Sequence, residues 1–169
     1  GNNKMSLSAW VNSDNYSGCG AFDLNVATPD GCQIMGRGPA AGHFWNLSAG
    51  AFPLGGPIRL RFRLQVDHVV KEVIGGQLIP GKWSFFVATY DGNSMRLYQD
   101  GGILVGDVLN PGTSITPGGE EQTSIGRSVG GKTFPGMLDE IAVYENVFSL
   151  VHIKKLYAKG SHKYKNMLR

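Results

Sequence analysis

The fold class is indicated most clearly by the segment IPGKWSFFVATYDGNSMRLYQDGGILVGDVL, residues 79–109. An apolar run at residues 83–90 ends at Asp-Gly-Asn (91–93), a second strand-like run covers residues 95–99, and a third begins after Asp-Gly-Gly (100–102). Glycine after aspartate favours hairpin turns, because glycine tolerates positive φ. The segment therefore predicts a meander of three antiparallel strands.

Short strand-like runs separated by turn residues continue on both sides of the meander. In the first of them, Met5 and Leu7 alternate with Ser6 and Ser8, the pattern of a half-buried strand. Further strands are predicted at MSLSAWV (5–11), CGAFDLNV (19–26), CQIMGR (32–37), HFWNLSA (43–49), IRLRFRLQV (58–66), HVVKEVI (68–74), TSIGRSV (123–129) and GMLDEIAVY (136–144). Roughly a dozen strands with one short helix describe an all-β, antiparallel two-sheet sandwich.

Helical spacing appears only near the C-terminus. It begins after Ser149, a suitable N-cap, and ends at Gly160, so we expect a sandwich over residues 1–160 and a basic tail over 161–169. Residues 152–169 hold six lysines and arginines and no acid, which leaves ten basic and thirteen acidic residues in the rest of the chain. A solvated tail is one interpretation of this charge, and an anion-binding arm is the other.

Length and composition limit the domain count, the fold class and the kinds of partner that this chain can have. At 169 residues the chain fits one domain, and 25 glycines and 8 prolines with 17% charged residues suit many short strands. Apolar runs stay well short of the roughly 20 residues that a membrane helix needs, so membrane insertion is not expected. No sequence element for reading or stacking on bases accompanies the basic residues, so nucleic acid is not expected as a partner.

The run IRLRFRLQV holds an arginine ladder. Leu60, Phe62 and Leu64 share one face of the expected strand, and the arginines share the other. Alternate residues of a strand lie about 6.5–7 Å apart, a spacing that matches repeated sulfates or carboxylates. The ladder, Arg59, Arg61 and Arg63, is therefore a candidate site for an acidic polysaccharide, and an ordinary solvated face that is partly paired with cross-strand acids is the alternative.

Two cysteines and two glycosylation sequons are informative about the cellular compartment in which the protein resides. Cys19 and Cys32 either form one disulfide, worth about 3 kcal/mol for such a loop, or remain free thiols. The sequons Asn15-Tyr16-Ser17 and Asn46-Leu47-Ser48 suit an exported protein. Secretion or display at the cell surface is the expectation that follows.

The run at 83–101, followed by SIGRS (124–128) and FPGMLDEIAVYENVFSLVHIKKLY (134–157), resembles the laminin-G-like jelly rolls of the concanavalin A-like lectin/glucanase superfamily, relatives of the pentraxins. The resemblance extends from Met5 to Gly160 and implies one concave and one convex sheet. It implies function only weakly, because this architecture hosts lectins, adhesins, hydrolases and structural modules. Family members usually have another strand before the one that matches residues 5–11. Either the given sequence starts after that strand, or the tail over residues 161–169 covers the edge, or a segment of another chain does. We expect an uncovered edge strand, available for self-assembly or a neighbouring chain.

The adjacent acids Asp139 and Glu140 are not expected to be catalytic. Neighbouring residues of a strand point to opposite faces, so the two carboxylates cannot act together on one glycosidic bond. In many members of the resembled family the aspartate of this pair helps to hold a structural calcium ion. Asp139 is therefore a candidate calcium ligand, and plain hydrogen bonding to loop amides is the alternative.

These features predict a protein that is not an enzyme: a recognition or adhesion module that binds glycan outside the cell. Trp45, which lies beside polar neighbours in GHFWNLSAG, is the best candidate for an exposed aromatic that stacks on a sugar, although a core position is the alternative. The rival interpretation is a structural subunit of an extracellular filament, sheath or virion, assembled through strand edges.

Overall fold

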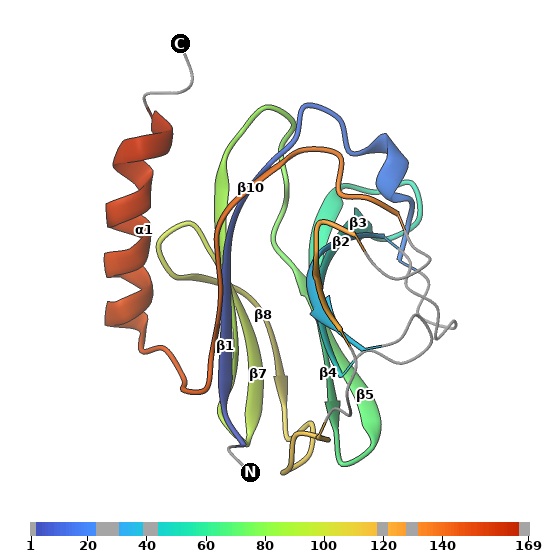
Figure 1. The fold of residues 1–169 in the computed structure, drawn as a ribbon, viewed down its shortest axis with the longest axis vertical. Coiled ribbons are helices and arrows are strands. Elements are labelled where there is room, and N and C mark those ends of the chain that lie inside the picture. The colour runs from blue at the N-terminus through green and yellow to red at the C-terminus, as the bar shows by residue number, and fades with distance from the viewer. Residues whose placement is uncertain (1–2, 23–30, 39–43, 118–121, 128–131, 166–169) are drawn as a thin grey trace.

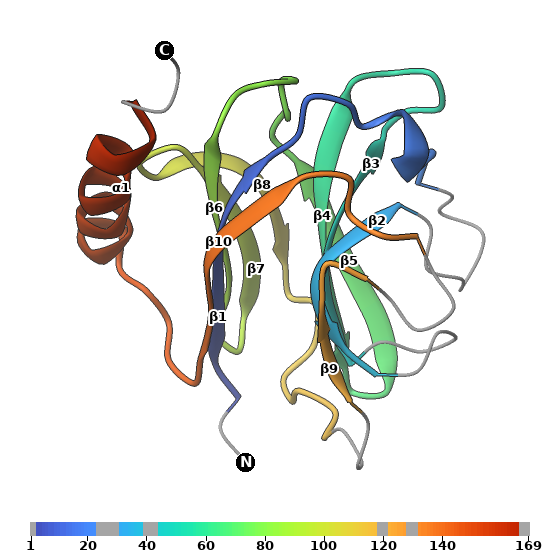
Figure 2. The ribbon, with the colours of Figure 1, turned by 45° about the horizontal axis from the view of Figure 1, so that its top comes forward.

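The computed structural model describes residues 3–22, 31–38, 44–117, 122–127 and 132–165. In this part of the chain ten strands form two antiparallel five-stranded sheets that face each other, and one helix lies outside the first sheet (Figures 1 and 2). The first sheet has the order β10 (Met137–Tyr144), β1 (Met5–Asn12), β6 (Ser84–Tyr90), β7 (Ser94–Gln99) and β8 (Ile103–Leu109). The second has the order β5 (Val69–Gly75), β4 (Ile58–Val66), β3 (Trp45–Ala51), β2 (Cys32–Arg37) and β9 (Thr123–Ile125). The all-β jelly-roll sandwich with one C-terminal helix is confirmed.

The meander and the inward face of β4 are as the sequence predicts. Strands β6, β7 and β8 follow one another and pair as antiparallel neighbours. Leu60, Phe62 and Leu64 of β4 are fully buried in the core between the sheets. Alternating apolar side chains therefore fix which face of each sheet is internal.

The prediction of a half-buried first strand is wrong. The apolar side of β1, including Leu7 and Val11, lies in the core as expected, but its other side is buried as well. Trp10 on that side packs under helix α1 (Leu150–Lys165), with its ring centroid 4.4 Å from that of Tyr164 and 5.6 Å from that of Tyr157. The helix supplies a third layer that strand periodicity cannot reveal.

The prediction of an uncovered N-terminal edge is also wrong. Strand β1 lies between β10 and β6 and pairs with both, so β10 forms the edge on that side. The chain returns from the opposite sheet to supply the partner that the sequence did not show. Assembly through β1 therefore lacks the free edge that it requires.

Helix α1 begins as predicted and ends later. Ser149 is its N-cap, since its Oγ accepts the N–H of His152 at 3.2 Å. Gly160 does not end it, and residues 161–165, predicted to belong to the basic tail, continue the helix. A Cβ atom built on Gly160 would lie only 2.4 Å from Nε1 of Trp10, so glycine permits close contact between helix and sheet.

One predicted strand is not formed where the structure describes it. Within residues 19–26, Cys19 ends a short 3₁₀ helix, η1 (Ser17–Cys19), and Ala21 makes only an isolated bridge to Ala51. The remainder of that predicted strand lies outside the described residues. The segment instead carries Phe22 across β3, where the Phe22 N–H donates to the carbonyl of Ala51 at 2.9 Å.

Candidate functional site

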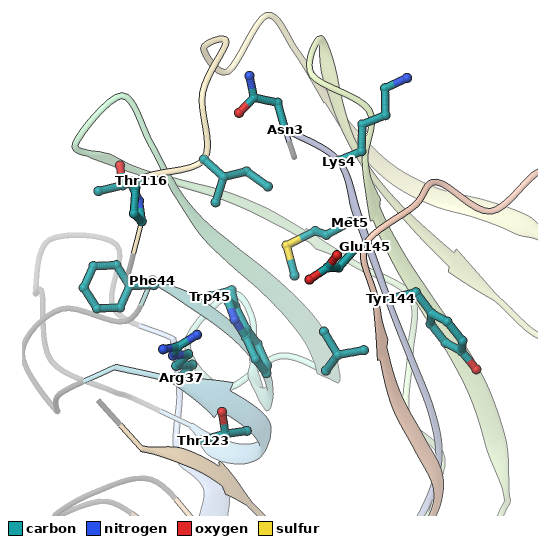
Figure 3. Close-up of a pocket in the computed structure, with 13 residues that line it drawn as sticks. Asn3, Lys4, Met5, Arg37, Phe44, Trp45, Thr116, Thr123, Tyr144 and Glu145 are labelled. Atoms are coloured by element: carbon teal, nitrogen blue, oxygen red, sulfur yellow. The ribbon is translucent and has the colours of Figure 1, made fainter. Parts of the chain in front are cut away.

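A cavity of about 540 Å³ opens between the sheets at the end of the sandwich where β1 begins (Figure 3). Its size falls within the range of about 300–1,000 Å³ that is usual for small-ligand sites. Strand ends and connections from both sheets contribute to it. The residues that line it are Asn3, Lys4, Met5, Arg37, Phe44, Trp45, Ile115, Thr116, Pro117, Thr123, Val143, Tyr144 and Glu145.

Two adjacent aromatic residues form one wall of the cavity. Trp45 opens β3 and pairs with Arg37 of β2 and Leu64 of β4. The backbone of Phe44 is held between the same strands, because its N–H donates to Arg37 and its carbonyl accepts from Gln65. Trp45 is only 9% exposed and belongs to the core, so the hypothesis of a freely exposed tryptophan is wrong. It nevertheless lines the cavity.

Charged side chains of both signs share this cavity. Arg37 ends β2, Glu145 follows β10, and Lys4 precedes β1. Figure 3 shows Arg37 with Trp45 on one side and Glu145 with Met5 on the other. The cavity thus combines an apolar surface with strong hydrogen-bond donors and an acceptor, which suits a compact polar ligand with one apolar face.

Sequence reasoning missed most of this site. The only residue it singled out here was Trp45, and the signal that was present was the neighbouring Phe44. Arg37, Glu145 and Lys4 stand at strand ends of both sheets, so only the folded chain shows that they share a cavity.

The arginine ladder is largely buried, but the cross-strand pairing with an acid that the alternative predicted is present, because Arg63 faces Glu72 of β5 in register. The three arginines do lie on the side of β4 away from the core, but Arg61 and Arg63 are 1% and 6% exposed. The Arg61 guanidinium lies 4.3 Å from the centre of the Phe22 ring, and Arg63 Nε donates to Glu72 Oε2 at 2.7 Å. Arg59, which is half-buried, donates to the carbonyls of Phe52 and Gly76. The predicted row of free guanidinium groups is therefore wrong, because the protein itself engages all three.

A network of buried polar side chains continues from β4 across the same face. Asn46 of β3 pairs with Arg63 in register and donates through Nδ2 to Gln33 Oε1 at 3.0 Å. Gln33 Nε2 in turn donates to Ser124 Oγ of β9 at 2.6 Å. These side-chain hydrogen bonds tie β3, β2 and β9 to one another, so their evident role is structural.

Asp139 fastens helix α1 to the sheet. Its Oδ2 accepts hydrogen bonds from the Lys163 ammonium and, at 2.7 Å, from the Tyr164 hydroxyl. Its Oδ1 accepts the N–H of Glu140, which has a positive φ of 48° at a shift in register between β10 and β1. The bonds from Lys163 and Tyr164 lower the pKa of Asp139 to about 2. Burial and the Asp139 carboxylate raise the pKa of Tyr164 above its usual value.

The surroundings of Asp139 fit a lysine ammonium and do not fit a calcium ion. Hard oxygen ligands would be needed from several groups, and a cation already sits on this carboxylate. Among the described residues, no three acidic, histidine or cysteine side chains cluster closely enough to hold a metal together. Calcium binding by this chain stays a prediction that titration can test.

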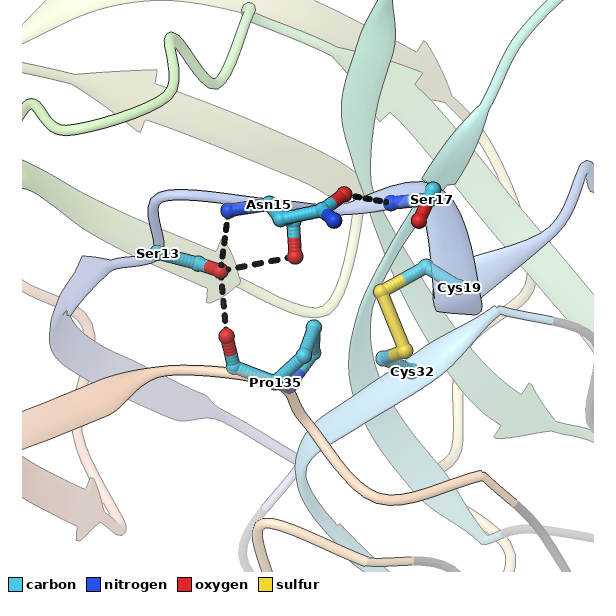
Figure 4. Close-up of a disulfide and its surroundings, with 6 residues drawn as sticks. All are labelled: Ser13, Asn15, Ser17, Cys19, Cys32 and Pro135. Atoms are coloured by element: carbon cyan, nitrogen blue, oxygen red, sulfur yellow. Dashed lines mark hydrogen bonds between the residues drawn. A yellow bond between two sulfur atoms is a disulfide. The ribbon is translucent and has the colours of Figure 1, made fainter.

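The structure joins Cys19 and Cys32 in a disulfide between η1 and β2 (Figure 4). Both cysteines are fully buried. The bonded alternative is therefore the one present, and it ties the segment after β1 to the second sheet.

In the described part of the chain, no helix combines the length and the apolarity that crossing a bilayer would require.

Comparison with known proteins places this architecture in a family. The sequence model of the concanavalin A-like lectin/glucanases superfamily matches residues 1–154. No curated protein sequence is significantly similar to the chain.

Solved structures share the fold at low sequence identity. Domain 4 of AbnA, a GH43 extracellular arabinanase from Geobacillus stearothermophilus solved with arabinotriose, is 15% identical with a TM-score of 0.63, and the match covers 92% of this chain and 66% of that one. A Bacteroides ovatus protein provisionally assigned to carbohydrate binding is 17% identical with a TM-score of 0.66, over 91% and 40%. The binding domain of botulinum neurotoxin serotype G is 12% identical with a TM-score of 0.64, over 94% and 37%. The chain therefore spans between 37% and 66% of these three solved chains.

Proposed function

Because the chain belongs to the concanavalin A-like lectin/glucanase superfamily, we propose that it is a non-catalytic carbohydrate-binding module whose ligand enters the cavity at the start of β1. The observation that carries the proposal is the meeting of the aromatic wall, Phe44 and Trp45, with Arg37 and Glu145. A sugar ring offers its C–H face to an aromatic side chain and its hydroxyls to charged donors and acceptors. The arabinanase domain solved with arabinotriose supports the class of ligand.

The absence of catalysis is part of the proposal. Glycoside hydrolysis uses two carboxyl groups about 5–9.5 Å apart on either side of one bond. Among the described residues that line the cavity, Glu145 is the single acid. Incubation of the purified protein with a panel of polysaccharides should therefore release no reducing ends, and sustained release would overturn this part of the proposal.

The proposal also includes a location outside the cell or at the cell surface. Disulfides persist in oxidising compartments, and the bond between Cys19 and Cys32 supports export. The rival function is a structural subunit that assembles through strand or edge contacts, and β1 offers no free edge for it because this strand is paired on both sides.

A glycan array followed by calorimetric titration with the best ligand tests the binding site. Arg37→Gln and Glu145→Gln each remove one charged hydrogen-bonding group and keep the side-chain size similar. A hydrogen bond to a charged group contributes about 1.5–3 kcal/mol, so each change should weaken binding by about tenfold or more. Glu140→Gln is the matched control, since Glu140 is an exposed acid of β10 that does not line the cavity.

Two results would contradict the proposal. One is an array on which the folded, disulfide-bonded protein retains no sugar at all. The other is a sugar whose affinity is the same for the wild type, Arg37→Gln and Glu145→Gln, because that ligand would bind elsewhere on the sandwich.

A further inference from the structure

The two glycosylation sequons occupy different environments in the folded chain. An Asn-x-Ser sequence marks an asparagine that can accept an oligosaccharide when it lies on an accessible surface. Asn15 is exposed in the connection after β1, whereas Asn46 lies inside β3 and is 3% exposed. Only the structure separates these two motifs, which look equivalent in the sequence.

The Asn46 sequon is closed to modification in the folded protein. Nδ2 of Asn46, the atom that would carry the sugar, donates to Gln33 Oε1 at 3.0 Å. A Cβ atom on Gly36 would lie 3.0 Å from the same nitrogen, so even one carbon fits tightly there. Ser48, the third residue of the motif, is 2% exposed. An oligosaccharide on Asn46 would require this part of the second sheet to unfold.

The Asn15 sequon has the opposite geometry (Figure 4). Asn15 Oδ1 accepts the N–H of Ser17 at 2.8 Å, and both residues are exposed. Tyr16 between them is buried and fixes the turn to the body of the protein. A Cβ atom built on the next residue, Gly18, would meet nothing within 4 Å, so there is open space beside the turn.

The connection that holds the sequon is well anchored. Ser13 Oγ accepts the N–H of Asn15 at 3.1 Å and hydrogen-bonds to the carbonyl of Pro135. On the other side, Cys19 ties the chain to β2 through the disulfide. The compartments in which such a bond forms include those in which proteins are glycosylated, so the two features are chemically compatible.

We propose that Asn15 is the site of an N-linked oligosaccharide and that Asn46 is not modified. The donor is an oligosaccharide linked through a pyrophosphate to a lipid carrier. A bond forms between Asn15 Nδ2 and C1 of the first sugar, the bond from C1 to the pyrophosphate oxygen breaks, Nδ2 loses one proton, and the lipid pyrophosphate leaves. This modification does not depend on the carbohydrate-binding function proposed above.

The position of Asn15 leaves the cavity accessible. Met5, which lines the cavity, and Asn12, which precedes the sequon, are the two ends of β1. At about 3.3 Å per residue, this strand separates them by roughly 23 Å. The oligosaccharide therefore covers the end of the sandwich that carries the disulfide.

The test routes the full chain through the secretory pathway of cultured animal cells and compares four proteins by intact mass and by peptide mapping after enzymatic release of N-glycans. The wild type should carry one oligosaccharide, mapped to Asn15. Ser17→Ala should abolish it, although the bond from the Ser17 backbone N–H to Asn15 Oδ1 is retained. Ser17→Thr should preserve the modification, and Ser48→Ala, which destroys only the second sequon, should leave it unchanged.

The proposal is overturned if secreted, disulfide-bonded wild type carries no glycan on Asn15. It is also overturned if the folded protein carries a glycan on Asn46, or if Ser48→Ala removes the mass increment that Ser17→Ala leaves in place. Sugar binding by the cavity should be equal for the wild type and Ser17→Ala, so a failure here is distinct from a failure of the proposed function.

Discussion

Replacing Gly160 by alanine should destabilise this protein, which is the reverse of the usual result for a glycine inside a helix. Alanine normally stabilises such a position by about 1 kcal/mol. Here the added Cβ would lie 2.4 Å from Nε1 and 2.6 Å from Cε2 of Trp10. The indole has little freedom to move, because it is 2% exposed and packs against both Tyr157 and Tyr164.

The size of the effect follows from two opposing terms. Overpacking a tight core costs about 1–3 kcal/mol, which exceeds the gain in helix propensity. A net loss of about 1 kcal/mol in the free energy of unfolding is expected, or a melting temperature lowered by about 2–4 °C for a domain of this size. Urea unfolding followed by tryptophan fluorescence, with thermal melts by circular dichroism, measures both quantities.

A double-mutant cycle isolates the cause. In a Trp10→Leu background the indole atoms are gone, so Gly160→Ala should recover the ordinary gain of about 1 kcal/mol. Gly18→Ala, at a site with open space around it, should change stability by less than about 0.5 kcal/mol. If Gly160→Ala stabilises the wild-type protein, helix α1 does not lie on Trp10 as described.

Three further predictions concern an ion pair, the disulfide and a buried arginine, and one concerns calcium. The pKa of Asp139 is about 2 in the folded protein and near 4 in the unfolded chain. The ionised carboxylate therefore stabilises the fold above about pH 4, and this contribution is lost as the pH falls toward 2. Asp139→Asn should therefore be less stable at pH 7, by under about 1 kcal/mol since the pair is partly exposed, and should match the wild type at pH 2 in acid-unfolding curves. Cys19→Ser with Cys32→Ser should cost about 3 kcal/mol in urea unfolding. Arg61→Ala should lower the melting temperature sharply and leave the retention of the folded fraction on a heparin column unchanged, since its guanidinium is already buried against Phe22. Titration with calcium should give no heat attributable to Asp139, so the signal should be equal for the wild type and Asp139→Asn.

The sequence predicted correctly those parts of the fold in which the residues of one short segment define the local structure. The alternation of Leu60, Phe62 and Leu64 and the Asp-Gly turns of the meander each define a local structure without reference to the rest of the chain. Capping by Ser149 is of the same kind, because a hydroxyl at that position bonds within its own turn. These features survive in the structure because tertiary packing agrees with them.

Two of the errors, those at Trp10 and Arg61, share one physical cause, which is an additional layer of side chains on the outer face of a sheet. Trp10 and Arg61 both occupy positions that a two-layer sandwich would expose, and both are buried by segments distant in the sequence, helix α1 and the residue Phe22. A tryptophan and an arginine are also the side chains that tolerate either environment, since each joins a large packing surface to a polar group. Periodicity therefore could not decide their burial.

The candidate site depends on topology in the same way. Arg37 and Glu145 stand at the ends of β2 and β10, which belong to different sheets, and the cavity exists only because the sandwich brings these ends together. Neither residue belongs to the apolar alternation that specifies its strand, so the pattern that predicts the fold carries no information about the cavity. The chemistry of the candidate site therefore has to be sought from the charged residues where the strands end and not from the core.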